Sequence, residues 1–329
     1  MKQMKKLMMS AILAAGMLSG CGSSTGEEMP KVSVAQIMAH KSLDTIRDSF
    51  DAEMKELGYV DGENIDLDYQ DAGGNTSTLE SILSTFAGDG TDVIVAIATP
   101  TAQGAARYAA DIPVIFSAVS DPITAGLTST LEEPDKNMTG TMDDVQVEQI
   151  LQRALEVDPD MERLGVVYNA SETNSVTNIA KAKQFCEENG IEVQEVTVTT
   201  SNDVQQAVET LCASCDAIFS PNDNTVASAM SAAAQAALEN QIPFYTGADS
   251  MVSDGGFMTV GIDYTELGRE TARMVDQVLK GTDVADIPVK QFKSDLSIYV
   301  NRDVMEALGI TLPDSIANSE NLVMMEQER

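Results

Sequence analysis

Short apolar runs of strand length alternate with longer amphipathic segments along most of this chain. Residues 93–98 form one such run, and after Thr99, Pro100 and Thr101 an alanine-rich segment of helix length begins. A chain that switches this regularly between strands and helices builds βαβ units, in which neighbouring strands run parallel. The sequence therefore predicts an α/β fold built on parallel sheets.

The same arrangement occurs once in each half of the chain. Residues 92–106 (DVIVAIATPTAQGAA) and 216–230 (DAIFSPNDNTVASAM) each contain an aspartate, an apolar strand, a turn with proline and an alanine-rich helix. We interpret the repeat as two Rossmann-like lobes, although a coincidence between two generic strand–helix units would leave the same pattern. Ligands of parallel sheets bind outside the carboxyl ends of the strands, so facing lobes would bring both turns to one cleft.

The last third of the chain supplies the segments that cross between the lobes. We expect residues 31–141 plus 257–286 to form lobe 1, and residues 142–256 plus 287–329 to form lobe 2. The crossing segments would then serve as hinges.

The first thirty residues have the pattern of a secretory leader. Three lysines precede an apolar segment at 7–18, which is too short to span a bilayer, and small residues follow it. The ending Leu-Ser-Gly-Cys resembles a bacterial lipobox, which implies removal of residues 1–20, lipidation (palmitate) of Cys21 and a flexible tether at 21–30. The mature protein would be anchored by lipid to the outer face of the bacterial cytoplasmic membrane. A plain signal peptide with an incidental cysteine is the alternative.

The charge of the chain restricts its partners. The chain has 52 Asp and Glu residues but only 20 Lys and Arg residues, which gives a net charge of −32. Nucleic acids and anionic membrane surfaces are bound by clustered cations, so neither is expected as a partner.

Signals for catalysis, metal or cofactor binding are weak. Neither a nucleophile elbow nor a phosphate-binding glycine loop is present, and a single histidine nearly excludes histidine triads and histidine-rich metal sites. Cys212 and Cys215 have the Cys-x-x-Cys spacing of redox or zinc sites, but a second ligand pair for zinc is missing. We favour an incidental pair and leave a disulfide open. We therefore expect that the protein is not an enzyme and that it needs no cofactor.

Polar residues after several predicted strands suit the binding of a small zwitterion. Thr99 and Thr101 flank a helix start whose free N–H groups suit a carboxylate, with N-capping by Thr99 as the alternative. Asp223 and Asn224 precede the matching helix, where a carboxylate could cap the helix or receive an ammonium group. His40 could stack on or bond to a ligand, or lie in a surface loop. The other candidates at strand ends are Ser117, Asp121, Asn169, Asn174, Ser175 and Asp249.

Taken together, several segments resemble a known family. It comprises the substrate-binding lipoproteins of bacterial ABC importers whose characterised members bind tryptophan, phenylalanine or tyrosine. The similarity runs in order from about residue 31 to 310, in the segments AHKSLDTIRDSFDAEMKELGYVDGENIDLDYQDAGG, VAIATPTAQ, IPVIFSAVSDPITAGL, YNASETNSV, PNDNTVASA and GIDYTELGRETA. The resemblance implies a type I periplasmic-binding-protein architecture, in which two lobes enclose the ligand.

The resemblance also implies a ligand-binding set. Its members would be His40, Thr99, Thr101, Gln103, Ser117, Asp121, Asn169, Asn174, Ser175, Asp223, Asn224 and Asp249. Thr99 to Gln103 would hold the ligand carboxylate, and Asp223 or Asp249 would take its ammonium group. Family members usually read Glu-His-Pro where this chain has Ala39-His40-Lys41, a departure that affects the specificity for the ligand side chain.

The leading hypothesis is a monomeric amino-acid receptor that closes on its ligand and delivers it to an ABC permease and its ATPase. A surface adhesin or a sensor subunit on the same scaffold is an alternative. A sugar receptor is another, although sugar sites often stack rings on aromatic residues and this chain has no Trp. A lipid-anchored hydrolase would need a nucleophile or a metal site.

Overall fold

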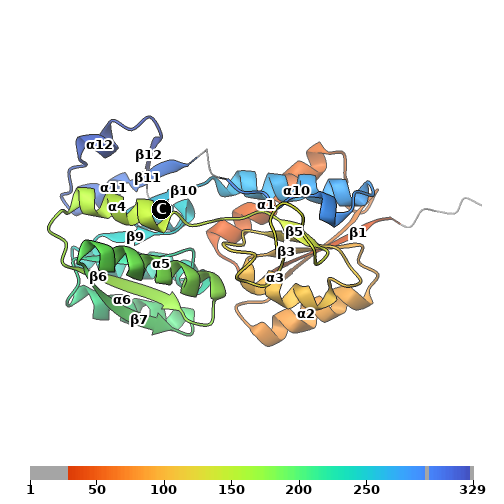
Figure 1. The fold of residues 1–329 in the computed structure, drawn as a ribbon, viewed down its shortest axis with the longest axis horizontal. Coiled ribbons are helices and arrows are strands. Elements are labelled where there is room, and N and C mark those ends of the chain that lie inside the picture. The colour runs from red at the N-terminus through yellow and green to blue at the C-terminus, as the bar shows by residue number, and fades with distance from the viewer. Residues whose placement is uncertain (1–28, 293–295, 327–329) are drawn as a thin grey trace, which may run out of the picture.

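A computed structural model describes residues 29–292 and 296–326 of the chain. The predicted signal peptide and Cys21 lie outside the described residues. The chain forms two α/β lobes side by side, each with its own sheet between helices (Figure 1). The predicted fold class is confirmed.

The sheet of lobe 1 is entirely parallel, with strand order β2-β1-β3-β4-β5. Helices on both faces bury its central strands, which explains why β3 and β4 are apolar throughout. The strands are β1 (Lys31–Gln36), β2 (Asp66–Asp71), β3 (Val93–Ile97), β4 (Val114–Ser117) and β5 (Met138–Gly140), and the helices of this part are α1 (Lys41–Glu56), α2 (Thr76–Gly88) and α3 (Thr99–Ala105).

The sheet of lobe 2 has the order β12-β11-β10-β9-β8-β6-β7 and is parallel except between β10 and β11. Its strands are β6 (Arg163–Asn169), β7 (Glu192–Val198), β8 (Ala217–Ser220), β9 (Phe244–Thr246), β10 (Met258–Gly261), β11 (Ser297–Asn301) and β12 (Leu322–Met325). Its helices are α4 (Val147–Val157), α5 (Thr173–Asn189), α6 (Val204–Cys212), α7 (Asn224–Ala227), α8 (Met230–Glu239), α9 (Asp249–Ser253), α11 (Arg302–Ala307) and α12 (Asp314–Ala317).

The chain crosses between the lobes after β5, after β10 and again after α10 (Tyr264–Leu279). β10 belongs to the second sheet, so the second crossing follows Gly261 and not residue 256 as expected. The third lies beyond residue 286, because Val289 and Lys290 still bond to Leu131 and Gly140 of lobe 1. A strand followed directly by a helix gives no sign in the sequence that the two belong to different lobes.

Helix α10 is held on lobe 1 by close packing against α1. A Cβ added to Gly268 would lie 2.0 Å from the Ser49 hydroxyl and 2.3 Å from the Ile46 carbonyl oxygen, so only glycine permits this approach. Next to this contact, the buried carboxylate of Glu53 accepts hydrogen bonds from Arg269 at 2.7 Å and Arg273 at 2.8 Å. The helix that leads out of the second crossing is therefore fixed to lobe 1.

The cysteine pair noted in the sequence forms neither a disulfide nor a metal site in the described part of the chain. Cys212 and Cys215 are free thiols, as is Cys186. Within residues 29–292 and 296–326, no group of histidine, cysteine and carboxylate side chains is arranged to hold a metal ion. No helix of the described chain combines the length and apolar character that a membrane span requires.

Candidate functional site

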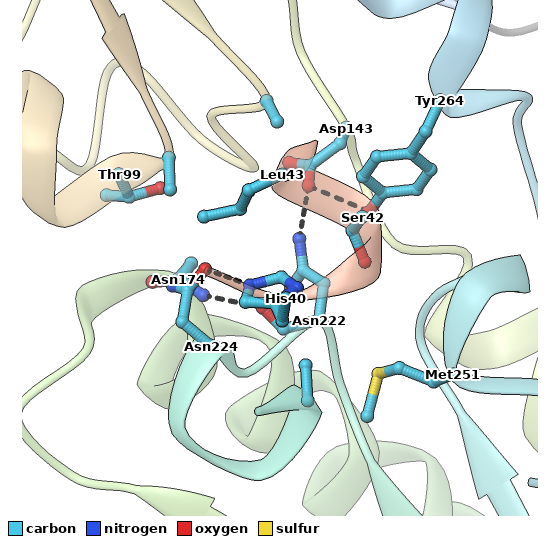
Figure 2. A pocket seen from close by; sticks show the side chains of 13 residues that line it. His40, Ser42, Leu43, Thr99, Asp143, Asn174, Asn222, Asn224, Met251 and Tyr264 are labelled. Atoms are coloured by element: carbon cyan, nitrogen blue, oxygen red, sulfur yellow. Dashed lines mark hydrogen bonds between the residues drawn. The ribbon is translucent and has the colours of Figure 1, made fainter. Parts of the chain in front are cut away.

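A narrow cavity lies between the two lobes, at the carboxyl ends of their strands (Figure 2). Its volume is about 10 Å³, room for about one water molecule, so the lobes must separate to admit anything larger. Both lobes and two of the crossings contribute side chains to the lining. The lining residues are His40, Ser42, Leu43, Ala98, Thr99, Ala118, Asp143, Asn174, Asn222, Asn224, Ala227, Met251 and Tyr264.

The charged group of the cavity is Asp143, which stands on the first crossing, between β5 and α4. Its carboxylate accepts hydrogen bonds from Ser120 at 3.0 Å, Asn222 at 2.6 Å and the hydroxyl of Tyr264 at 3.1 Å. Burial raises the pKa of Asp143 to about 6, against the pull of these hydrogen bonds toward a lower value. A buried carboxylate without a cation beside it favours a positively charged ligand group.

Asn222 connects the lobes through the same group. Its amide nitrogen, in the turn after β8 of lobe 2, donates to Asp143 on the crossing and to the Ser120 hydroxyl of lobe 1 at 2.8 Å. Both hydrogens of that nitrogen are used across the cleft. Asn222 therefore holds the closed arrangement of the lobes.

Three buried polar atoms of lining residues have no hydrogen-bond partner within the described chain. They are Nδ1 of His40, the hydroxyl of Thr99 and the side-chain oxygen of Asn174. A buried polar atom without a partner costs about 1–3 kcal/mol, and most native structures avoid it. Figure 2 shows Thr99 and Asn174 on one side of the cavity, across from Asp143 and Tyr264. The cavity is thus lined for a ligand with several polar groups.

Thr99 reaches the cavity because α3 begins one residue earlier than N-capping by Thr99 would require. The N-cap is Ala98, and Pro100 occupies the first turn, where its missing N–H costs nothing. Ala98 has φ 76° and ψ 156°, a conformation that residues other than glycine rarely adopt. Ala118, also in the lining, has φ 55°. Strained alanines at the ends of β3 and β4 therefore form part of the wall.

Replacing Ala98 by glycine relieves this strain. We expect Ala98→Gly to raise the free energy of unfolding by about 1 kcal/mol, the strain released less the added chain entropy of glycine. Ala102→Gly, in the regular helix that follows, should lower it by about 1 kcal/mol. Urea unfolding of both variants checks the prediction, and a loss of stability in Ala98→Gly would contradict it.

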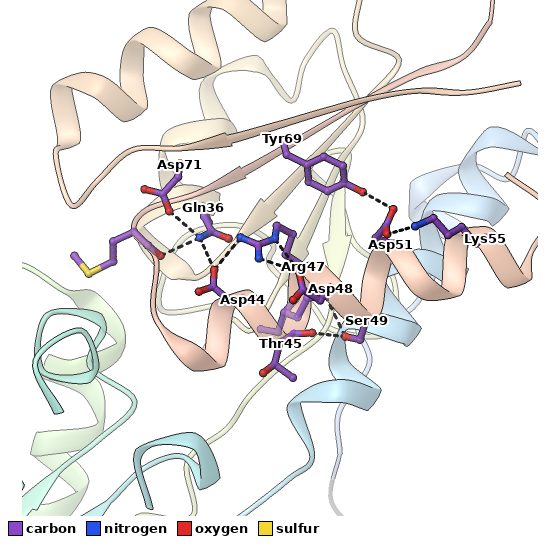
Figure 3. A network of polar contacts seen from close by, with 12 residues as sticks. Gln36, Asp44, Thr45, Arg47, Asp48, Ser49, Asp51, Lys55, Tyr69 and Asp71 are labelled. Carbon is purple, nitrogen blue, oxygen red and sulfur yellow. Dashed lines mark hydrogen bonds and ion pairs between the residues drawn. The ribbon is translucent and has the colours of Figure 1, made fainter. Parts of the chain in front are cut away.

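His40 stands in the loop between β1 and α1 of lobe 1 and contacts lobe 2 across the cleft. In lobe 1 the Gln36 amide lies 3.3 Å from the Met38 carbonyl, 3.1 Å from Asp44 and 2.7 Å from Asp71, which fixes the loop between β1 and α1 (Figure 3). In lobe 2 the side-chain oxygen of Asn224 lies 3.1 Å from Nε2 of His40. The imidazole therefore joins the two lobes at the edge of the cavity.

Asp223, which we expected as a partner of the ligand ammonium, is used within lobe 2. Its fully buried carboxylate accepts from the Asn169 N–H at 2.7 Å, the Ser175 hydroxyl at 2.6 Å and the Val226 N–H at 2.8 Å. It caps α7 and ties β6 and α5 to it. The capping role that the sequence left open is the one that the geometry favours.

Of the twelve candidate site residues, the structure brings His40, Thr99, Asn174 and Asn224 together in the cavity. The other eight lie outside the described lining, Asp223 among them. Asn169 and Ser175 donate to Asp223, Ser117 accepts from Thr271, Asp121 bonds within its own turn, and Asp249 bonds to the Ser250 N–H. Gln103 donates to Thr173 of the other lobe, and Thr101 is buried. Burial raises the pKa of Asp249 to about 6.

Sequence reasoning missed the two residues on the crossings, Asp143 and Tyr264, and it missed Asn222. Asp143 follows a strand of only three residues, and Tyr264 opens a helix. The altered position Lys41 contacts the Ser253 hydroxyl at 2.7 Å, and its neighbour Ser42 contacts Ser250, so this departure from the family pattern lies where the lobes meet.

Comparisons with known proteins agree with this geometry. The family model described as "ABC transporter substrate binding protein" matches residues 31–323. A "Tyrosine-binding protein" of Clostridioides difficile is 35% identical over 94% of this chain and 93% of its own length. A domain from Streptococcus pneumonia solved in complex with L-Trp is 33% identical, with a TM-score of 0.85 over 90% of this chain and 99% of that one.

A third comparison concerns the arrangement of the lobes. The ligand-free, open structure of a substrate binding protein with adhesive properties from Clostridium difficile is 38% identical and covers 91% of this chain and 100% of that one, yet its TM-score is only 0.67. The structure with L-Trp bound fits better at a lower identity. The structure described here is therefore more similar to the ligand-bound relative than to the open one.

Proposed function

The chain belongs to the family of ABC transporter substrate-binding proteins, and from this premise we propose that it is an extracytoplasmic receptor for an aromatic amino acid. The amino acid is bound between the lobes and delivered to an ABC permease and its ATPase. The observation that carries the proposal is the buried carboxylate of Asp143 in a cavity that also contains unpartnered polar atoms.

In this proposal Asp143 binds the α-ammonium group of the ligand, the role first expected of Asp223 or Asp249. The hydroxyl of Thr99 donates to the ligand carboxylate. Leu43, Met251 and the ring of Tyr264 pack against the ligand side chain. Of the candidates outside the lining, Asn169, Ser175 and Asp223 shape the wall, and Gln103 holds the lobes together through Thr173.

Asp143 also makes closure dependent on the ligand. Raising its pKa from 3.8 to about 6 corresponds to about 3 kcal/mol of unfavourable free energy at neutral pH, at about 1.4 kcal/mol per unit. A ligand ammonium beside the carboxylate removes this cost in the closed form and not in the open one. Such a difference between the two forms is what allows a ligand to drive closure.

Two relatives support an aromatic ligand. One relative, 35% identical to this chain, is named a tyrosine-binding protein, and a domain 33% identical was solved in complex with L-Trp. The cavity wall contributes an aromatic ring from Tyr264 and a polarizable thioether from Met251, both of which pack well against aromatic rings. A sugar receptor would more often stack its ligand on tryptophan, which this chain lacks.

We infer a signal peptide at 1–20, lipidation at Cys21, a monomeric mature chain without cofactor or nucleic-acid partner, and attachment to the outer face of the membrane by lipid alone. Cys21→Ser should release the protein from the membrane fraction. Adhesion is a second candidate function, because a relative 38% identical is described as having adhesive properties.

A thermal-shift screen of the unlipidated chain against all amino acids and common sugars tests the proposed function. A ligand at 1,000 times its dissociation constant adds about 4 kcal/mol to stability, which raises Tm by several degrees. We expect this response with tyrosine, tryptophan or phenylalanine. A response to a sugar and to no amino acid would refute the proposal.

The affinity for the amino acid should depend on pH through Asp143. Burial holds the pKa of Asp143 near 6 in the absence of a cation, whereas a bound ammonium lowers it, so the complex takes up the proton at lower pH. Affinity should therefore be full at neutral pH and fall as the pH drops through the pKa of Asp143 in the unliganded protein, by up to about tenfold per unit. Calorimetric titrations from pH 5 to 8 measure how the affinity changes with pH. Asp143→Asn should abolish the part of this change that comes from the titration of Asp143. An unchanged slope in that variant would contradict the assignment.

A further inference from the structure

Glu172 lies behind the cavity wall and contacts the turn that carries Asn224. It is the N-cap residue of α5, and its carboxylate is buried. One of its oxygens accepts from the Asn224 N–H at 3.0 Å and from the Asn224 side-chain nitrogen at 2.5 Å. The other accepts from the Thr225 N–H at 3.1 Å and the Thr225 hydroxyl at 3.0 Å.

These contacts fix the orientation of the Asn224 amide. Burial and the nearby Asp223 raise the pKa of Glu172 to about 7. Above that pH its ionised carboxylate only accepts hydrogen bonds, so the nitrogen of the amide faces Glu172. The amide oxygen then faces His40, where it lies 3.1 Å from Nε2. An amide oxygen also only accepts, and therefore Nε2 must carry the proton.

The other ring nitrogen of His40 is then an acceptor. Burial lowers the pKa of His40, so the ring is neutral and has one proton, which Nε2 already carries. Nδ1 is buried without a partner among the described residues, and His40 lines the cavity. Its lone pair can be satisfied only by an N–H or O–H group.

We propose that Glu172 is a positioning residue that, through Asn224, fixes His40 as a hydrogen-bond acceptor, so that the ligand must present a donor to Nδ1. The inference rests on the proposed amino-acid receptor and adds a selection rule to it. The donor is the α-ammonium group or the side-chain N–H or O–H of the ligand. Since His40 is in lobe 1 and Asn224 and Glu172 are in lobe 2, this selection is complete only when the lobes close.

The single histidine of the chain makes a direct test possible. Long-range ¹H–¹⁵N spectra of protein saturated with L-tyrosine, L-tryptophan or L-phenylalanine, whichever binds most tightly, report which ring nitrogen carries the proton. We expect a protonated Nε2 and an unprotonated Nδ1 at pH 8, where Glu172 is ionised. Glu172→Gln and Asn224→Ala should each remove this preference. Glu195→Gln, the same change at a partly exposed carboxylate of lobe 2, should leave it intact.

Affinities identify the donor. Glu172→Gln should weaken binding about 10- to 100-fold, as expected for a hydrogen bond to a charged group. His40→Leu should weaken tyrosine and tryptophan alone if their side chains supply the donor, and all three amino acids alike if the ammonium does. His40→Leu without effect on any of them would overturn the inference.

Failure of the inference can be told from failure of the proposed function. If none of the three amino acids binds to the unchanged protein, the receptor function is overturned, and the inference with it. If they bind while the proton sits on Nδ1, or while folded Glu172→Gln keeps the original tautomer, only the inference falls. Circular dichroism melting curves establish that each variant is folded.

Discussion

Asp143→Asn should weaken amino-acid binding about 100-fold or more while the protein remains folded. Truncating one partner of a buried, hydrogen-bonded charge pair costs about 2–5 kcal/mol, because the other charge is left without compensation. Asparagine has nearly the shape of aspartate, and with its oxygen in the place of Oδ2 it still accepts from Tyr264 and Asn222. Ser120 donates to Oδ1 and loses that acceptor. The loss therefore reports the charge together with the Ser120 hydrogen bond, and not the packing.

The neighbouring residue provides the matched control. Asp144 is exposed and pairs with Lys181 at 2.9 Å on the surface of lobe 2. Asp144→Asn makes the same chemical change one position along the same crossing, and it should alter affinity less than twofold, since exposed pairs contribute about 0–1 kcal/mol. Calorimetric titration of both variants decides the matter. Equal affinities would show that Asp143 does not bind the ammonium group.

Gly247→Ala is expected to lower the stability of the protein strongly. Gly247 follows β9, and a Cβ there would lie 2.4 Å from the Asn222 nitrogen and 2.5 Å from the Pro221 carbonyl carbon. These are backbone atoms, so the turn that carries Asn222 must shift to make room. We expect the free energy of unfolding to fall by about 3 kcal/mol. Amino-acid affinity should fall too, because the Asn222 contacts to Ser120 and Asp143 depend on that turn.

Gly261→Ala is the comparison for this prediction. A Cβ at Gly261, the last residue of β10 in lobe 2, meets nothing within 4 Å. The free energy of unfolding of Gly261→Ala should differ from that of the unchanged protein by less than about 1 kcal/mol. Denaturant unfolding of the two variants, followed by titration with ligand, separates packing from binding. Similar stability in both would mean that the turn after β8 tolerates displacement.

The fold could be predicted from sequence because strand and helix periods alternate clearly in both halves. The same reasoning placed His40, Thr99, Asn174 and Asn224 at the edge where the cavity lies, since the carboxyl ends of parallel strands meet at one edge of each sheet. Crossings between lobes carry no such signal. Asp143 and Tyr264 reach the cavity through the path of these crossings, and the packing of α10 on α1 fixes the one that carries Tyr264.

Sequence alone also cannot show which of two neighbouring polar residues in a turn faces the cleft. Asn222 and Asp223 are adjacent, yet Asn222 faces the cleft and Asp223 is turned into lobe 2. The tight turn in which the Asp223 N–H bonds to the Pro221 carbonyl at 2.8 Å, and the capping of α7, decide between them. Side-chain composition alone cannot show this. For the same reason the contact between Glu172 and Asn224 could not be predicted from sequence.

Calorimetric titration of the unlipidated protein with L-tyrosine, L-tryptophan and L-phenylalanine tests the central claim most directly. We predict 1:1 binding of at least one of them, with a dissociation constant of about 1 μM or lower, equivalent to about −8 kcal/mol. The heat capacity change should be negative, because apolar surface is buried as the lobes close. No binding of any of the three, at concentrations where a sugar binds, would contradict an aromatic amino-acid receptor.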